Sequence, residues 1–173
     1  MNIFFLEHNP ELCAKYHNDK HCVKMILETA QILSTAHRVL DGQELVIYDS
    51  RQELLYKATH INHPCSVWVR QSSQNYSWAY NLFVELLNEY TYRYGKTHKS
   101  SELMRMLEYI PVRPADGEFT EPAQAMPDDV KVPGNSVIAY RKYYRKYKNH
   151  LAQWKNREIP FWFTGEEIAN ISV

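Results

Sequence analysis

Six polar side chains recur at steps of three or four residues near the amino terminus, and several are types that transfer protons. They are His17, His21, Lys24, Glu28, Gln31 and Thr35. On a helix at about 100° per residue these positions form one narrow stripe. Two imidazoles, an amine, a carboxylate and an amide in line suit general acid–base catalysis. The solvated face of an ordinary amphipathic helix would give the same stripe, so the stripe alone leaves both interpretations open.

Lys24 and Glu28 lie one helical turn apart and would form an ion pair on any helix. If this face is covered, a partly desolvated lysine becomes a nucleophile that forms imines. A carboxylate beside it can stabilise a sugar cation or move protons. The chain has no glycine-rich phosphate loop, GxSxG elbow or catalytic cysteine motif, so neither P-loop nucleotide hydrolysis nor acyl transfer is expected.

Four histidines raise the question of a metal. His17 and His21 form an HxxxH pair, and His60 and His63 belong to the sequence HINHP. The first pair has Asn18 where the helix of a zinc protease carries glutamate, and no cysteines are suitably paired. We therefore expect neither a metal nor another cofactor, and we assign the loop histidines to hydrogen bonding at a cleft or to plain loop structure.

Hydrophobic periodicity predicts a mainly α fold: a single compact domain over residues 1–173, with three long helices plus short helices and a long proline-rich loop. An extended segment at 2–6 precedes the first long helix, which Asn9 or Pro10 begins, which includes 12–40 and which stops near Asp41-Gly42. Further helices are expected at 51–59, 66–94, 100–109 and 136–157. Residues 111–134 hold five of the eight prolines and are expected to wrap the surface.

Bulk composition is that of a globular protein, with 45% hydrophobic and 23% charged residues and a formal net charge of zero. The three cysteines have no CxxC spacing and fit reduced, buried thiols. The initial apolar run is too short for a signal peptide, and no stretch is long enough to span a membrane. We expect a cytoplasmic protein without membrane partners.

The net charge of zero conceals a basic region near the carboxyl terminus. Between positions 137 and 157 the chain has seven basic residues and no acidic one, and an aromatic cluster follows at 161–163. Basic side chains that contact phosphate, combined with aromatic side chains that stack on nucleobases, are typical of a nucleic-acid groove. A solvated basic face with its tyrosines in the core is the alternative. The residues expected to contact nucleic acid are Arg141, Lys142, Arg145, Lys146 and Lys148.

The run Asp19-Lys20-His21, with Glu28 seven residues after the histidine, resembles the helix of the phage pyrimidine-dimer DNA glycosylase (endonuclease V) family. That family has Asp-x-His followed seven residues later by its catalytic glutamate, also near the amino terminus. The similarity continues at 62–64 and 93–95, where a His-Pro loop precedes a long helix, and at 157–163, the aromatic segment. The chain also resembles uncharacterised phage proteins that share this opening helix and His-Pro loop.

The resemblance implies an all-α DNA glycosylase, with or without AP-lyase activity, that acts on a damaged or modified base in double-stranded DNA. In the family the N-terminal α-amine attacks C1′, the glutamate assists, and β-elimination follows. Transferred to this chain, the resemblance makes Glu28 the catalytic carboxylate and His21 its near neighbour on the same helix face. The nucleophile stays open between the Met1 amine, Lys24 and water, because the family trims Met before a small residue and Asn2 stands here.

The same hypothesis gives substrate-binding roles to a further set of residues. They are His17, Gln31, His63, Arg93, Phe161 and Trp162. The family flanks its glutamate with arginines, whereas Leu27 precedes Glu28 here, so the base that is removed stays open. Two other functions also remain open: a small-molecule nucleoside or nucleotide N-glycosidase or processing enzyme, and a non-enzymatic phage protein that inhibits a host factor through the proline-rich loop. A phage-encoded chain would act in the host cytoplasm.

Overall fold

The computed structural model describes residues 1–42, 55–111 and 117–165, and within these ranges the chain is helical without a β-strand. The mainly α prediction is therefore confirmed. The α-helices are α1 (Pro10–Tyr16), α2 (Asp19–Leu40), α4 (Pro64–Val69), α5 (Ser73–Tyr94), α6 (Met104–Leu107), α7 (Ser136–Tyr147) and α8 (Phe161–Thr164). Short 3₁₀ turns are η2 (Lys99–Leu103), η3 (Asp128–Val130) and η4 (Asn149–Leu151). None of the described helices is long and apolar enough to cross a membrane.

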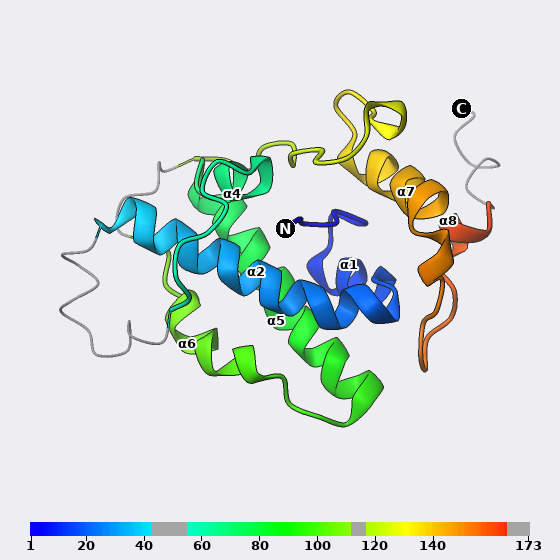
Figure 1. Cartoon of the computed structure of the whole chain (residues 1–173), viewed down its shortest axis with the longest axis horizontal. Coiled ribbons are helices and arrows are strands. Elements are labelled where there is room, and N and C mark those ends of the chain that lie inside the picture. Colours follow the sequence, from blue (N-terminus) through cyan, green and yellow to red (C-terminus); the bar gives the residue numbers. More distant parts are fainter. Residues whose placement is uncertain (43–54, 112–116, 166–173) are drawn as a thin grey trace.

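The two long helices α2 and α5 pack against each other and form the centre of the fold (Figure 1). Their facing sides carry apolar residues at helical spacing, as an amphipathic pattern requires. Ile26 and Leu33 of α2, and Leu82 and Leu86 of α5, are buried in one continuous core. Helix α1 packs on α5, and α4 contacts both long helices. Glu28 and Lys24 are therefore held on a helix whose other side is anchored in the core.

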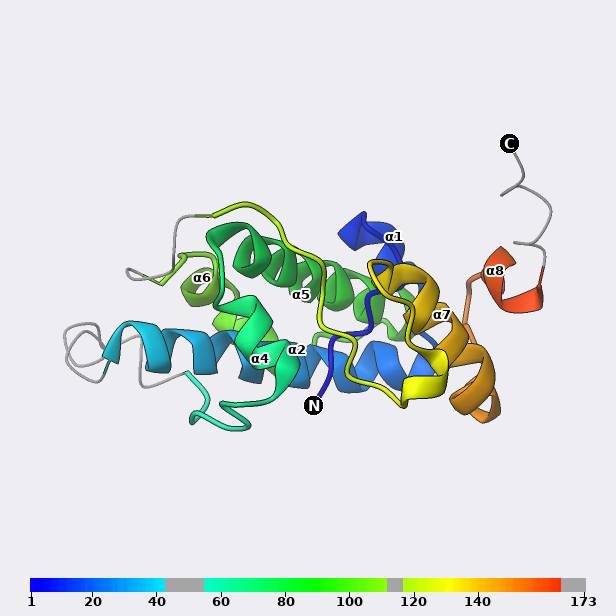
Figure 2. The ribbon, with the colours of Figure 1, turned by 90° about the horizontal axis from the view of Figure 1, so that it is seen from above.

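The amino-terminal segment runs through the core rather than over it. Ile3, Phe4, Phe5 and Leu6 are all buried. The backbone carbonyl of Phe4 accepts a hydrogen bond from the Cys13 thiol of α1. Figure 2 shows the N-terminus between α4 and α7, next to α2. The start of the chain is thus fixed by packing on several sides.

The helix expected at 12–40 is interrupted, which corrects the first long-helix prediction. His17 ends α1 with an extended ψ of 130°, and Asn18 begins α2 by accepting a hydrogen bond from the backbone N–H of His21 at 2.9 Å. An asparagine that caps a helix satisfies a backbone donor that a continuous helix would have paired internally. His17 therefore does not belong to the polar stripe of α2.

The other long helices also differ from their predicted ranges. The segment 66–94 divides into α4 and α5, because Ser72 caps α5 by accepting from the N–H of Asn75. The helix expected at 136–157 ends at Tyr147, followed by η4 and turns. The short helix expected at 100–109 is the η2–α6 pair. Residues 55–59 are not helical, and the rest of the helix predicted at 51–59 lies outside the described residues.

The described part of the proline-rich segment, residues 117–134, crosses the surface as expected and contains the short turn η3 (Figure 2). Thr120 and Asn75 of α5 bond to each other twice, through N–H to Oδ1 at 2.9 Å and Nδ2 to Oγ1 at 2.8 Å. The indole N–H of Trp68 donates to the Thr120 carbonyl at 3.1 Å. The segment is an integral part of the fold and borders the amino terminus.

Candidate active site at the amino terminus

The structure brings three of the predicted catalytic groups together around one carboxylate. The α-amine of Met1 lies 3.7 Å from Glu28 Oε2, and the Asn2 backbone N–H donates to the same oxygen at 3.0 Å. Lys24 Nζ lies 3.2 Å from Oε1. Met1 and Glu28 are far apart in the sequence, so the buried amino-terminal segment creates this contact. The carboxylate is balanced by one ammonium group at each oxygen.

Burial distinguishes the members of this cluster. Glu28 is only 9% exposed. Met1 as a residue is half-buried although its side chain is only 2% exposed, so its exposed atoms belong to the main chain, where the α-amine is. The Met1 sulfur accepts a hydrogen bond from Ser66 Oγ at 3.6 Å. The side chain thus anchors residue 1, and the part of this residue that reaches solvent is main chain.

Asn2 fixes the position of the chain end. Its Nδ2 donates to the Ala125 carbonyl of the proline-rich segment at 3.0 Å. Its Oδ1 lies 2.9 Å from the Tyr140 hydroxyl of α7 and accepts from the Cys65 thiol of α4 at 3.3 Å. Three elements far apart in sequence therefore hold one side chain. Periodicity cannot reveal such contacts, and the role of Asn2 was missed by the sequence analysis.

Two further titratable groups adjoin the amine from α4. His63 accepts a hydrogen bond at Nδ1 from the N–H of Cys65 and so caps α4. Burial lowers the pKa of His63, and the positive charge of the N-terminus lowers it further, so the ring is held neutral. Burial raises the pKa of the Cys65 thiol. Cys65 is therefore a poor nucleophile at neutral pH, because the thiolate is the reactive form.

His21 is not presented to solvent as the stripe suggested. Its ring stacks on Phe4 with centroids 4.3 Å apart, and its Nδ1 lies 2.6 Å from the Tyr144 hydroxyl. Desolvation lowers the pKa of His21 to about 3 and that of His17, buried beside Cys13, to about 4. Both rings are neutral at physiological pH. We correct their predicted roles to packing and hydrogen bonding beneath the site.

Acidification is expected to destabilise the protein through these two rings. Their folded pKa values lie below the ordinary 6.5, so the unfolded chain binds more protons and stability falls as pH decreases from 6.5 toward 4. Each ring should account for about 2 kcal/mol between pH 6.5 and pH 5. Urea unfolding at pH 7 and pH 5 measures this. His17→Gln should remove about half of the difference and the exposed His150→Gln none of it; identical pH dependence in His17→Gln would contradict the assignment.

Lys24 is exposed, with 58% of its side chain accessible, so the desolvation that would activate a lysine is missing. It instead belongs to a group of ammonium side chains around His21. Lys20 and Lys24 lie one turn apart on α2, and Lys148 lies over the Tyr143 ring, which stacks with the Phe4 ring that covers His21. After desolvation and His17, the charges of these three lysines also lower the pKa of His21. Lysines from α2 and from the end of α7 therefore give the face beside Glu28 a positive charge.

Arg93 does not lie on a binding surface, which corrects its predicted substrate role. Its side chain is fully buried and donates to Glu89, to Asp19, and to the backbone carbonyls of Lys15 and His17. It thereby ties α5 to the end of α1 and the start of α2. The guanidinium is occupied by structural partners.

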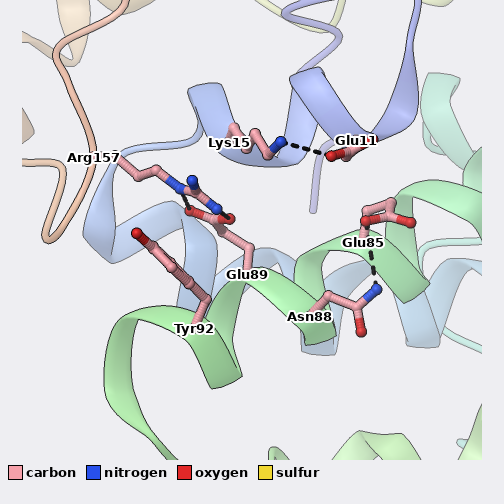
Figure 3. A pocket seen from close by; sticks show the side chains of 7 residues that line it. All are labelled: Glu11, Lys15, Glu85, Asn88, Glu89, Tyr92 and Arg157. Carbon is pink, nitrogen blue, oxygen red and sulfur yellow. Dashed lines mark hydrogen bonds and ion pairs between the residues drawn. The ribbon is translucent and has the colours of Figure 1, made fainter.

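A pocket of about 200 Å³ lies beside this network, lined from α1, α5 and the loop that carries Arg157 (Figure 3). Figure 3 shows Arg157 against the carboxylate of Glu89, and Lys15 against Glu11. The guanidinium of Arg157 also lies over the Tyr92 ring, 3.9 Å from its centroid. These charges are paired with one another, so we assign the pocket to structure rather than to chemistry.

The aromatic carboxyl-terminal cluster lies away from the amine. Figures 1 and 2 both place α8 at the end of the molecule beyond α7. Trp162 is fully buried, and its ring lies 5.4 Å from the guanidinium carbon of Arg141. Phe161 is half exposed but packs beside Tyr16. Trp162 is therefore not available to stack on an extruded base, and Phe161 lies with it beyond α7.

The predicted basic surface of α7 is divided by the structure. Arg141 is buried, donates to the Leu6 carbonyl and pairs with Glu7, so it is not available to phosphate. Lys146 pairs with Asp129 of η3. Lys142, Arg145 and Lys146 line a shallow depression against η3. Lys148 is the member that lies close to His21, and Gln31 is half-buried on α2 one turn beyond Glu28.

The described arrangement offers an amine nucleophile beside a buried carboxylate, with a cationic face around them. Among the residues that the structure describes, no group of three or more histidine, cysteine, aspartate or glutamate side chains is placed to hold a metal ion. Comparison of the chain with protein-family models, curated proteins and solved structures finds no match.

Proposed function

We propose that the protein is a DNA glycosylase with AP-lyase activity that uses the α-amine of Met1 as nucleophile and Glu28 as its proton-transfer partner. The observation that carries the proposal is the 3.7 Å contact between that amine and the buried carboxylate. An α-amine is a weaker base than a lysine side chain, so more of it is neutral and nucleophilic near pH 7. The exposure of Lys24 favours Met1 over the lysine.

In the proposed reaction, Glu28 takes a proton from the Met1 ammonium group. The nitrogen lone pair then forms a bond to C1′, while the C1′–base bond breaks and its electrons leave with the base. The Glu28 carboxylate also stabilises the positive charge that develops on the sugar. The departing base takes a proton from the attacking nitrogen. Glu28 then passes its proton to O4′ as the C1′–O4′ bond breaks, which leaves a protonated imine between the amine and C1′. Loss of the C2′ proton from this imine expels the 3′ phosphate by β-elimination.

The surroundings of the amine favour a duplex over a free nucleoside. Small-molecule sites are enclosed cavities that bury most of their ligand. The depression next to the site, lined by residues 58–63, is broad and open. Lys20, Lys24 and Lys148 on the adjoining face suit contact with a phosphate backbone. Double-stranded DNA is therefore the proposed partner.

The small-molecule N-glycosidase is the alternative that shares this chemistry, since the same amine and carboxylate would act on a nucleoside. The inhibitor alternative assigns binding of a host factor to the proline-rich loop, in which Thr120 and Ala125 are tied to the fold and to Asn2. Salt dependence separates the two enzymes, because binding of DNA releases counterions and binding of a neutral nucleoside does not.

Binding to a 25-base-pair duplex with a tetrahydrofuran abasic analogue should weaken steeply between 50 and 200 mM salt. Three phosphate contacts predict a slope of about −2.7 in log K against log salt, and Lys20→Ala should reduce it by about 1. Lys96→Ala, at an exposed site beyond α5, is the control and should leave the slope unchanged. Release of base from damaged duplexes, such as ultraviolet-irradiated DNA, is assayed in parallel. Salt-independent binding, or release only from free nucleosides, would contradict the proposal.

A further inference from the structure

The loop that leads into α4 lies directly beside the proposed nucleophile. Its last residue, His63, caps α4, and the first turn of that helix contacts the chain end. Cys65 donates to the Asn2 side chain, and Ser66 donates to the Met1 sulfur. Figure 2 shows this loop and the N-terminus on the same edge of the molecule. Residues 58–63 line one depression, so the tip of the loop borders the same space as His63, whose pKa the charge of the N-terminus lowers.

Ile61 occupies that tip with 42% of its surface exposed. Its chain neighbours His60 and Asn62 are polar and exposed. An exposed branched apolar residue between polar neighbours, on a loop that borders a reactive group, suits contact with an apolar surface of the substrate. In DNA the apolar surfaces are the faces of stacked bases.

The loop is held rigidly although it is exposed. Thr59 bonds to Thr35 of α2 through both its N–H and its carbonyl, at 3.2 and 3.3 Å. Arg70 donates to the backbone carbonyl of Ile61 at 2.7 Å. The His63 N–H donates to the His60 carbonyl at 2.9 Å. These bonds fix the backbone on both sides of Ile61 and present its side chain in one place.

His60 has a φ of +48°, an unfavourable region for a residue with a side chain. Such strain persists only where the surroundings impose it, and it concentrates at functional sites. Here the left-handed residue begins the turn that the His63 N–H closes on the His60 carbonyl, and Ile61 lies exposed within that turn.

We propose that Ile61 inserts between base pairs of duplex DNA and fills the space left when the target nucleotide turns out toward Met1. Enzymes that act at C1′ must take the nucleotide out of the stack, and apolar side chains that enter a base step stabilise the opened duplex. Ile61 is thus a positioning residue, and its role rests on the function proposed above. The flanking His60 and Asn62 would face the backbone or the edges of the parted bases.

The test uses a duplex in which 2-aminopurine stands opposite a tetrahydrofuran abasic analogue, because this base fluoresces when it is unstacked. Wild-type protein should raise the fluorescence at least threefold on binding. Ile61→Ala should lose most of that rise while its Kd stays within threefold, and Ile61→Leu should restore it. Ile159→Ala, which truncates an isoleucine that is 55% exposed elsewhere, is the matched control and should behave as wild type. Thermal unfolding confirms that each variant is folded.

A second assay separates this inference from the proposed function. At a natural abasic site no base has to be extruded, so Ile61→Ala should still form the borohydride-trapped adduct within threefold of the wild-type rate. If Ile61→Ala unstacks 2-aminopurine as well as wild type does, the proposed insertion of Ile61 is overturned and the glycosylase proposal stands. If wild-type protein neither binds the duplex nor is trapped on it, the proposed function fails, and the insertion of Ile61 fails with it.

Discussion

Replacement of Glu28 by glutamine is expected to lower the rate of base release by about 10²- to 10⁴-fold, the usual contribution of a positioned proton-transfer group. Glutamine keeps the shape of the side chain and still accepts the Asn2 N–H, so the site should stay folded. It cannot take the proton from the Met1 ammonium group or stabilise a sugar cation. Single-turnover assays on damaged duplex measure the rate, and the Kd should stay within about threefold.

Glu11→Gln is the matched control for that change. Glu11 also pairs with a lysine one helical turn away, Lys15 at 2.6 Å, and its substitution alters the net charge by the same amount. It lies on α1 in the structural pocket of Figure 3. Wild-type turnover is expected for Glu11→Gln. Wild-type turnover in Glu28→Gln would instead rule out the proposed mechanism.

Replacement of Arg93 by methionine is expected to lower the free energy of unfolding by about 3–5 kcal/mol, the usual cost of breaking a buried ion pair. The substitution leaves the Lys15 and His17 carbonyls and part of the Glu89 carboxylate without a donor. The junction between α1 and α2 loses its link to α5. Urea denaturation followed by circular dichroism measures the change.

Arg157→Met removes a second guanidinium from the same carboxylate, at 2.8 Å, but from a partly exposed position. Since exposed pairs contribute little, it should cost only about 1 kcal/mol. If Arg93→Met is as stable as wild type and instead loses affinity for duplex DNA, Arg93 binds substrate as the sequence suggested. Equal destabilisation in both variants would show that burial does not govern this network.

The sequence was sufficient to predict the helical class and the position of Glu28 on a core-anchored helix, because both follow from hydrophobic periodicity. It did not predict the break at His17-Asn18. Periodicity continues across that break, where His17 ends α1 and Asn18 caps the start of α2. The histidines were misassigned for a related reason. Spacing cannot show that Phe4 and Tyr144 cover the ring of His21.

The contacts that build the site link distant parts of the chain, and this is why the sequence left the nucleophile open. Asn2 meets Ala125 and Tyr140 only after the amino-terminal segment enters the core. The composition of the basic run in α7 indicated a positively charged surface. Its members nevertheless have different environments: Arg141 forms a buried ion pair, whereas Lys148 lies near the site. Local pattern does not determine which side chain of a charged helix faces the interior.

Borohydride trapping on a duplex with an abasic site is the measurement that tests the role of the Met1 amine most directly. Reduction of the imine gives a stable protein–DNA adduct, and mass spectrometry of the linked peptide identifies the nitrogen that carries the sugar. Wild type and Lys24→Ala should both be trapped at residue 1, and protein with a chemically blocked α-amine should not be. An adduct that survives the block and disappears in Lys24→Ala, or no adduct at all, would contradict the account.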